Sequence, residues 1–130
     1  MSNQKALVVE DSPIPQKIVK LELIKMQYDV DTTNTGGEAI QLACDNKYDV
    51  ILMDIGLDDM TGCDATEQIR QSGMNTSTLI IALTAHNDDD TRASCAAVGM
   101  DAFMAKPFTK EKFQEVLKNL GKSKKPQPGR

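Results

Sequence analysis

The stretch Val50-Ile51-Leu52-Met53-Asp54 decides the fold that this sequence predicts. Four consecutive apolar residues are typical of a central parallel strand that is covered on both of its faces. The run ends on the carboxylate of Asp54, and residues 55–62, which include Gly56 and Gly62, indicate a loop. Because ligands in open α/β sheets bind at the carboxyl ends of the strands, Asp54 is the first candidate for a functional residue.

Three other strand-like segments end on polar groups in the same way. They are residues 6–9, followed by Glu10 and Asp11; residues 79–83, followed by Thr84; and residues 102–105, followed by Lys106. Carboxylates at one sheet edge suit a hard cation such as Mg²⁺. A hydroxyl and an ammonium group suit the oxygens of a phosphoryl group. The strand ends therefore predict a site for metal-assisted phosphoryl chemistry.

Helix-like segments alternate with the strand-like ones along the whole chain. The predicted strands cover residues 6–9, 28–33, 50–53, 79–83 and 102–105. Five βα units predict a flavodoxin-like (βα)5 protein of the α/β class, a three-layer sandwich around a parallel five-stranded sheet. Right-handed crossovers and short loops favour the strand order 2-1-3-4-5. In that order the first, third, fourth and fifth strands are contiguous, so their polar ends would share one pocket.

Hydroxyl side chains and glycines predict where several helices begin and end. The expected N-terminal caps are Ser12, with Pro13 in the first turn; Thr61, three residues before Asp64; and Thr109. The acidic residues 88–90 suit the positive end of the fourth helix. The expected ends are about Ser72 for the third helix, Val98 before Gly99 for the fourth, and Gly121 for the last.

The length and composition indicate one acidic domain. All 19 acidic residues but only 11 of the 15 basic residues lie in residues 1–120, so that part carries a net charge of −8. Residues 121–130 are basic and are expected to form a flexible tail or linker after the domain. Nucleic-acid binding needs a basic footprint, so we expect no nucleic-acid partner.

The chain contains no membrane, secretion or zinc-binding pattern. No apolar stretch approaches the roughly 20 residues that span a bilayer, and Glu10 and Asp11 interrupt any signal-peptide core. Three widely spaced cysteines with no Cys-x-x-Cys pair indicate reduced thiols. We therefore expect a cytoplasmic domain that makes no membrane contact.

The clustered acids also predict a chemical step. Carboxylates at one edge repel one another unless a cation offsets them. A divalent cation held by Asp11 and Asp54, with waters and a backbone carbonyl, would neutralise most of this charge. The remaining oxygen of Asp54 would be free to attack a phosphoryl group and form an aspartyl phosphate. Lys106 and the metal would stabilise charge on the transferring oxygens.

Four motifs resemble those of the receiver domain of two-component response regulators. They are VVEDS at 8–12, LMDI at 52–55, IALTA at 81–85 and AKPF at 105–108, and the resemblance covers residues 5–120. It implies that Asp54 accepts phosphate from a histidine, with Mg²⁺ bound by Glu10, Asp11, Asp54 and the Gly56 carbonyl. It also implies that Thr84 and Lys106 contact the phosphoryl group, and that Phe103 is a switch aromatic. Because Phe103 has no hydroxyl to hold its ring in water, we expect its inward rotamer to be well populated even before phosphorylation. The responsive surface would comprise the fourth helix, the fifth strand and the last helix.

The resemblance also implies partners and an origin. The segments at 81–86 and 99–108 look like receivers attached to hybrid sensor histidine kinases, so we expect a domain excised from such a kinase. Its donor would be a histidine kinase or a histidine phosphotransfer domain, and the domain itself would be a monomer or weak dimer. Family members often carry Met-Pro where this chain has Leu57-Asp58, which alters the expected partner contacts there. Asp58 and Asp59 are expected to be solvated charges.

Three alternatives remain open. The nearest is a stand-alone single-domain response regulator. A second is a Mg²⁺-dependent phosphohydrolase with an aspartate nucleophile, but haloacid-dehalogenase-like enzymes need a second Asp where this chain has Gly56. A phosphoacceptor with slow self-dephosphorylation is therefore favoured over an enzyme that turns over, although the parent chain would be a kinase. A flavin-binding flavodoxin relative is disfavoured because Glu10 and Asp11 would repel a phosphate after the first strand.

Overall fold

The computed structural model describes residues 4–71, 73–85 and 89–123. Five strands alternate with five helices in these ranges. Their order is β1 (Gln4–Val9), α1 (Pro13–Lys25), β2 (Tyr28–Thr33), α2 (Gly36–Asp45), β3 (Val50–Asp54), α3 (Gly62–Gln71), β4 (Leu79–Thr84), α4 (Asp89–Ala97), β5 (Ala102–Ala105) and α5 (Lys110–Ser123). The strands form one sheet in the order β2-β1-β3-β4-β5, and every pairing is parallel. The predicted fold class and strand order are confirmed.

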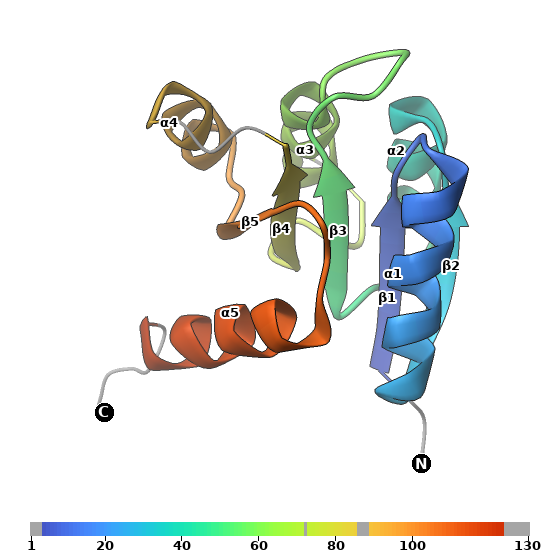
Figure 1. The fold of residues 1–130 in the computed structure, drawn as a ribbon. Coiled ribbons are helices and arrows are strands. Elements are labelled where there is room, and N and C mark those ends of the chain that lie inside the picture. The colour runs from blue at the N-terminus through green and yellow to red at the C-terminus, as the bar shows by residue number, and fades with distance from the viewer. Residues whose placement is uncertain (1–3, 72, 86–88, 124–130) are drawn as a thin grey trace.

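Helices cover both faces of the sheet and create two apolar cores (Figure 1). Alternate residues of each strand point to opposite faces, so the central strands are apolar throughout. One core joins Leu7, Ile51 and Ile80 to side chains of α2, α3 and α4. The other joins Val8 and Leu52 to side chains of α1 and α5. All five residues of β3 are buried, as the opening run of apolar residues predicts.

Local capping explains most of the helix starts. The hydroxyls of Thr61 and Thr109 accept hydrogen bonds from the backbone N–H groups of Asp64 and Lys112, at 3.0 and 3.1 Å. Ser12 occupies the N-cap position of α1, but the predicted capping bond is wrong because its side chain accepts none. Instead, the Ser12 backbone N–H donates to the Glu10 carboxylate at 3.2 Å.

The helix ends agree in part with the prediction. Gly99 follows α4 with φ of 100°, a left-handed conformation that glycine adopts without steric cost. The predicted end of the last helix at Gly121 is wrong, because α5 continues to Ser123. One glycine costs a helix only about 1 kcal/mol, and the backbone hydrogen bonds of α5 carry it past that position. Ser72, Asp88 and residues 124–130 of the predicted tail lie outside the described residues.

Within the described residues, none of the helices is long and apolar enough to cross a bilayer.

Candidate functional site

The parallel register brings four strand ends to one edge of the sheet. Asp54 is the last residue of β3 and is paired with Leu83 of β4, one residue before Thr84. Thr84 is paired in turn with Ala105 of β5, one residue before Lys106. Glu10 and Asp11 directly follow β1, which lies on the other side of β3. Asp11, Asp54, Thr84 and Lys106 line one hollow, and Glu10 lines an adjoining hollow together with Lys106.

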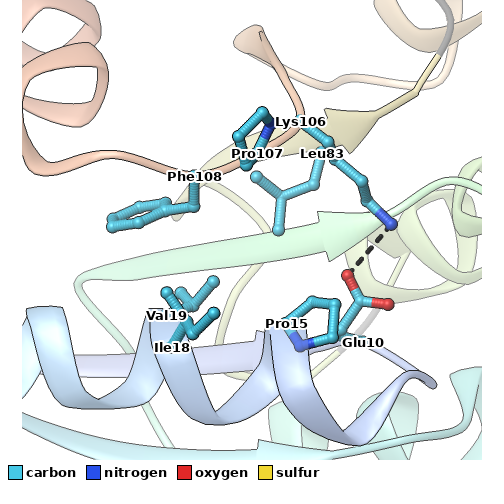
Figure 2. Close-up of a pocket in the computed structure, with 8 residues that line it drawn as sticks. All are labelled: Glu10, Pro15, Ile18, Val19, Leu83, Lys106, Pro107 and Phe108. Atoms are coloured by element: carbon cyan, nitrogen blue, oxygen red, sulfur yellow. Dashed lines mark ion pairs between the residues drawn. The ribbon is translucent and has the colours of Figure 1, made fainter.

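Lys106 lies between two buried carboxylates and pairs with both. Its Nζ is 3.0 Å from Oε1 of Glu10 and 3.1 Å from Oδ2 of Asp54. The carboxylate side chains are only 1% and 6% exposed, whereas the lysine side chain is 29% exposed. Figure 2 shows the Glu10–Lys106 pair at the end of an apolar hollow. The lysine thus offsets two acids that would otherwise repel each other in a poorly hydrated site.

The surroundings change the proton affinity of these groups. Burial is the main cause that raises the pKa of the Glu10 carboxyl, followed by its hydrogen bond to Asp54. Burial also raises the pKa of Asp11, and the nearby charges of Asp58 and Asp54 add to the effect. The pKa of Lys106 is raised by its bonds to Glu10 and Asp54, which outweigh the opposing effect of burial. The site therefore has excess negative charge that a further cation would relieve.

Three carboxylates fit a divalent cation. Ligand oxygens of Glu10, Asp11 and Asp54 all lie within 4.8 Å of one another. All three are hard oxygen donors of the kind that Mg²⁺ prefers. Gly56, the predicted carbonyl ligand, lines the same hollow as Asp11 and Asp54. Its backbone N–H donates to Oδ1 of Asp54 at 3.1 Å, which orients the carboxylate.

The loop between β3 and α3 is held from both sides. Gly62 donates to the Ile55 carbonyl at 2.7 Å, and a Cβ on Gly62 would lie 2.3 Å from the backbone oxygen of Asp54. This close approach explains why glycine occupies the start of α3. On the other side, the Asp59 carboxylate accepts hydrogen bonds from the first two N–H groups of α2, at 2.8 and 2.9 Å. Asp59 is exposed, as predicted, but it also anchors the start of α2, which the sequence did not indicate.

Thr84 and Phe103 lie on neighbouring strands beside the site. Thr84 is 5% exposed and lines the hollow that contains Asp54. Phe103 is partly buried and packs against the core that includes Cys95 of α4. The guanidinium carbon of Arg92 in α4 lies 4.3 Å from the centre of the Phe103 ring. A cation over a ring face is attracted to it, so the ring has a charged partner that the sequence did not indicate.

A second hollow adjoins the site on the side of α1. Its lining is largely apolar and comes from α1 and from the segment after β5 (Figure 2). Glu10 and Lys106 close the end nearest Asp54. The peptide bond between Lys106 and Pro107 is cis, and Phe108 of this segment is buried against the core of α1 and α5.

Three contacts near the site were not predicted from the sequence. Thr35 caps α2 by accepting from the Glu38 N–H at 3.1 Å, and its Thr-x-x-Glu pattern was a signal that could have revealed it. The Asp59 contact with α2 and the Arg92 contact with Phe103 had no comparable local signal, because each joins residues of different elements.

The family profile of the response regulator receiver domain matches residues 6–118 of this chain. The chain is 35% identical over 124 residues to the response regulator ArlR of Staphylococcus saprophyticus, covering 95% of this chain and 54% of that protein. It is 31% identical over 111 residues to the sensor histidine kinase RcsC of Escherichia coli K12, covering 85% of this chain and 12% of the kinase. The chain thus spans about half or less of these two relatives.

Solved structures show the same likeness. The receiver domain of the sensor histidine kinase PA1611 from Pseudomonas aeruginosa, with a magnesium ion coordinated in its active-site cleft, is 35% identical with a TM-score of 0.83. The chemotaxis protein CheY4 of Vibrio cholerae is 28% identical with a TM-score of 0.86. Each similarity covers 92% of this chain and 99% of the other chain.

Proposed function

This chain belongs to the response regulator receiver domain family, and we propose that it is a phosphoacceptor of a two-component phosphorelay. In this proposal Asp54 takes a phosphoryl group from a phosphohistidine donor. The observation that carries it is the position of the Lys106 ammonium, within 3.1 Å of Asp54 and beside three clustered carboxylates. A buried acid at a sheet edge, with a cation on one side and a metal-binding set on the other, suits nucleophilic attack on a phosphoryl group.

The residues of the chain divide the work of the transfer. Asp54 supplies the attacking oxygen, and the Gly56 N–H holds the Oδ1 atom of its carboxylate in place. Lys106 is placed to move from the carboxylate to an oxygen of the incoming phosphoryl group, where its charge is needed. Glu10, Asp11, Asp54 and the Gly56 carbonyl would hold Mg²⁺, which when bound offsets the negative charge of the acids and of the phosphoryl oxygens. Asp54 with its phosphoryl group would then contact the Thr84 hydroxyl.

The surface of α1 supports a helical donor. Four apolar side chains on this helix are strongly exposed: Ile14 at 73%, Ile18 and Leu21 at 48% each, and Ile24 at 45%. Exposed apolar patches of this kind mark interaction surfaces. The stripe continues into the hollow that ends at Glu10 and Lys106 (Figure 2), so a partner packed on α1 would reach Asp54. A histidine kinase or a histidine phosphotransfer domain, which presents its histidine on a helix bundle, is the partner proposed.

The responsive surface is proposed to be formed by α4, β5 and α5. Phe103 and Arg92 line hollows between these elements, together with Val116 of α5. A shift of Thr84 toward a phosphoryl oxygen would change the space available to the Phe103 ring and the contact of that ring with Arg92. The surface then differs between the two states, which is what a switch requires.

The parent protein is proposed to be a hybrid sensor histidine kinase. The 35% identity to a sensor kinase receiver over nearly its full length supports this origin. A stand-alone regulator is the second candidate, supported by the 28% identity and the TM-score of 0.86 to CheY4. An immunoblot of cells that make the protein decides between them, since only the first predicts a product far larger than 130 residues.

Acetyl phosphate tests the phosphoacceptor function directly. With Mg²⁺, the intact mass of the wild-type protein should rise by one phosphoryl group, and the Asp54→Ala protein should show no change. Glu67→Gln is the control, because this exposed carboxylate lies on α3, does not line the hollow that contains Asp54, and should leave the yield unchanged. Phosphorylation of Asp54→Ala at the wild-type yield would contradict the assignment.

A further inference from the structure

Two cysteines that play no part in the proposed phosphoryl transfer lie side by side. Cys63 is in the first turn of α3 and Cys95 is in α4, and their Sγ atoms are 3.8 Å apart. Both are free thiols in the structure. The third cysteine, Cys44, is exposed on α2.

The two thiols differ in access. Cys63 is partly buried and lines an open hollow between the β3–α3 loop and α4, so small solutes can reach it. Cys95 is 0% exposed and belongs to the apolar core. Burial, together with the neighbouring Cys63, raises the pKa of the Cys95 thiol to about 11. An oxidant from solvent would therefore meet Cys63 first, while Cys95 stays a thiol.

We propose that Cys63 and Cys95 form a site of reversible oxidation to a disulfide, with hydrogen peroxide as the oxidant. In the first step the Cys63 sulfur attacks one peroxide oxygen, the O–O bond breaks, and the leaving hydroxide takes the thiol proton as water. This gives a sulfenic acid on Cys63. In the second step the Cys95 sulfur attacks the Cys63 sulfur, the S–O bond breaks, and hydroxide leaves with the Cys95 proton as a second water. Two thiols are oxidised and one peroxide is reduced to two waters.

Disulfide formation requires the Cys63 and Cys95 sulfurs to move closer together, and the backbone around each cysteine determines which side chain or helix can move. A disulfide holds its sulfurs about 2.0 Å apart, so the two atoms have to approach by roughly 1.8 Å from their 3.8 Å separation. Cys63 has little backbone freedom, because Gly62 before it is packed against the end of β3. The approach is therefore expected to come from side-chain rotation of Cys63 and a small shift of α4.

The consequence for signalling rests on the proposed function. A disulfide would tie α4 to the start of α3, and through Gly62 to the strand that carries Asp54. Because α4 is part of the proposed responsive surface, the oxidised domain should accept a phosphoryl group but respond less at α4. Oxidation would then act on the output of the domain and leave the phosphorylation step intact.

The modification is tested on the full chain with Cys44→Ser as the background, which removes the exposed thiol. After hydrogen peroxide treatment, the intact mass should fall by two hydrogens and return with dithiothreitol, and peptide mapping should link Cys63 to Cys95. Cys95→Ala should instead trap a dimedone-reactive sulfenic acid on Cys63. Cys95→Ala changes a buried side chain and could impair folding, so Cys63→Ser, which changes a partly exposed one, is the second variant. It should yield no linked product. The urea-unfolded protein gives the reference rate of disulfide formation when the fold does not hold Cys63 and Cys95 together.

Two results would overturn the proposal. One is accumulation of higher oxides on Cys63 without a disulfide, and the other is pairing no faster in the folded than in the unfolded protein. These measurements use no phosphodonor, so failure of Asp54 to accept phosphate leaves them unaffected. The signalling consequence is then measured as NMR shifts of α4 on phosphorylation. Equal shifts in the oxidised and reduced proteins would refute that consequence alone.

Discussion

Lys106 should hold the site together at neutral pH, and removing its charge should destabilise the fold in a pH-dependent way. Lys106→Met keeps most of the stem and removes the ammonium group that contacts Glu10 and Asp54. Breaking a fully buried ion pair costs roughly 3–5 kcal/mol. The lysine side chain is 29% exposed, so solvent replaces part of its effect, and we expect a loss of about 2 kcal/mol at about pH 8.

The pKa of Glu10 sets the direction of the pH dependence. An acid whose pKa is raised in the folded state stabilises the fold when protonated, and this stability is lost as the pH rises through the folded pKa. Glu10 is such an acid, with a pKa above its ordinary value of 4.5, and Lys106 lowers that pKa. Without the lysine the pKa rises further, so the loss of stability extends to higher pH. The difference between wild type and Lys106→Met should therefore be larger at about pH 8 than at about pH 5.

Urea unfolding without Mg²⁺ at these two pH values measures the effect. Lys112→Met is the matched control, because Lys112 is exposed and its Nζ contacts only the carbonyls of Ala105 and Pro107 among the bonds described. Carbonyls do not titrate, so that variant should lose less than about 1 kcal/mol at either pH. Mg²⁺ should restore part of the stability of Lys106→Met, by about 1.4 kcal/mol at ten times its dissociation constant. An equal loss at both pH values, or a loss no larger than in Lys112→Met, would refute the reasoning.

Three further changes test other parts of the site. Asp11→Asn should weaken Mg²⁺ binding, so millimolar Mg²⁺ should raise the melting temperature of the wild type more than that of the variant; a wild type that does not respond would contradict the metal site. Thr84→Ala should leave phosphorylation largely intact but uncouple it from the surroundings of Phe103, and NMR shifts over residues 89–108 that equal those of the wild type would remove Thr84 from the mechanism. Gly62→Ala should cost about 2 kcal/mol of unfolding free energy, because its Cβ would meet a backbone oxygen of β3 at 2.3 Å. Gly56→Ala is its control, with no atom within 4 Å of the added carbon, and equal urea midpoints for the two variants would show that the close approach is unimportant.

Local patterns in the sequence were enough to predict the sheet, its order and the edge where the polar groups meet. The apolar run at 50–53 specifies a buried central strand because only a strand covered on both faces tolerates it. Thr61 and Thr109 predict helix starts because a cap acts within three residues of itself. Asp54 and Lys106 could be placed in one pocket because parallel strands end at the same edge.

What the sequence did not determine depends on contacts between distant elements. Asp59 reads as a solvated acid, yet it accepts two hydrogen bonds from α2, more than twenty residues earlier. Arg92 lies over Phe103, and Cys63 lies beside Cys95, only because α4 packs where it does against α3 and β5. Each of these contacts requires the angle and depth at which a helix packs on the sheet. Such packing is set by the fit of many side chains at once, whereas strand order follows from the handedness of the crossovers and capping from a few neighbouring residues.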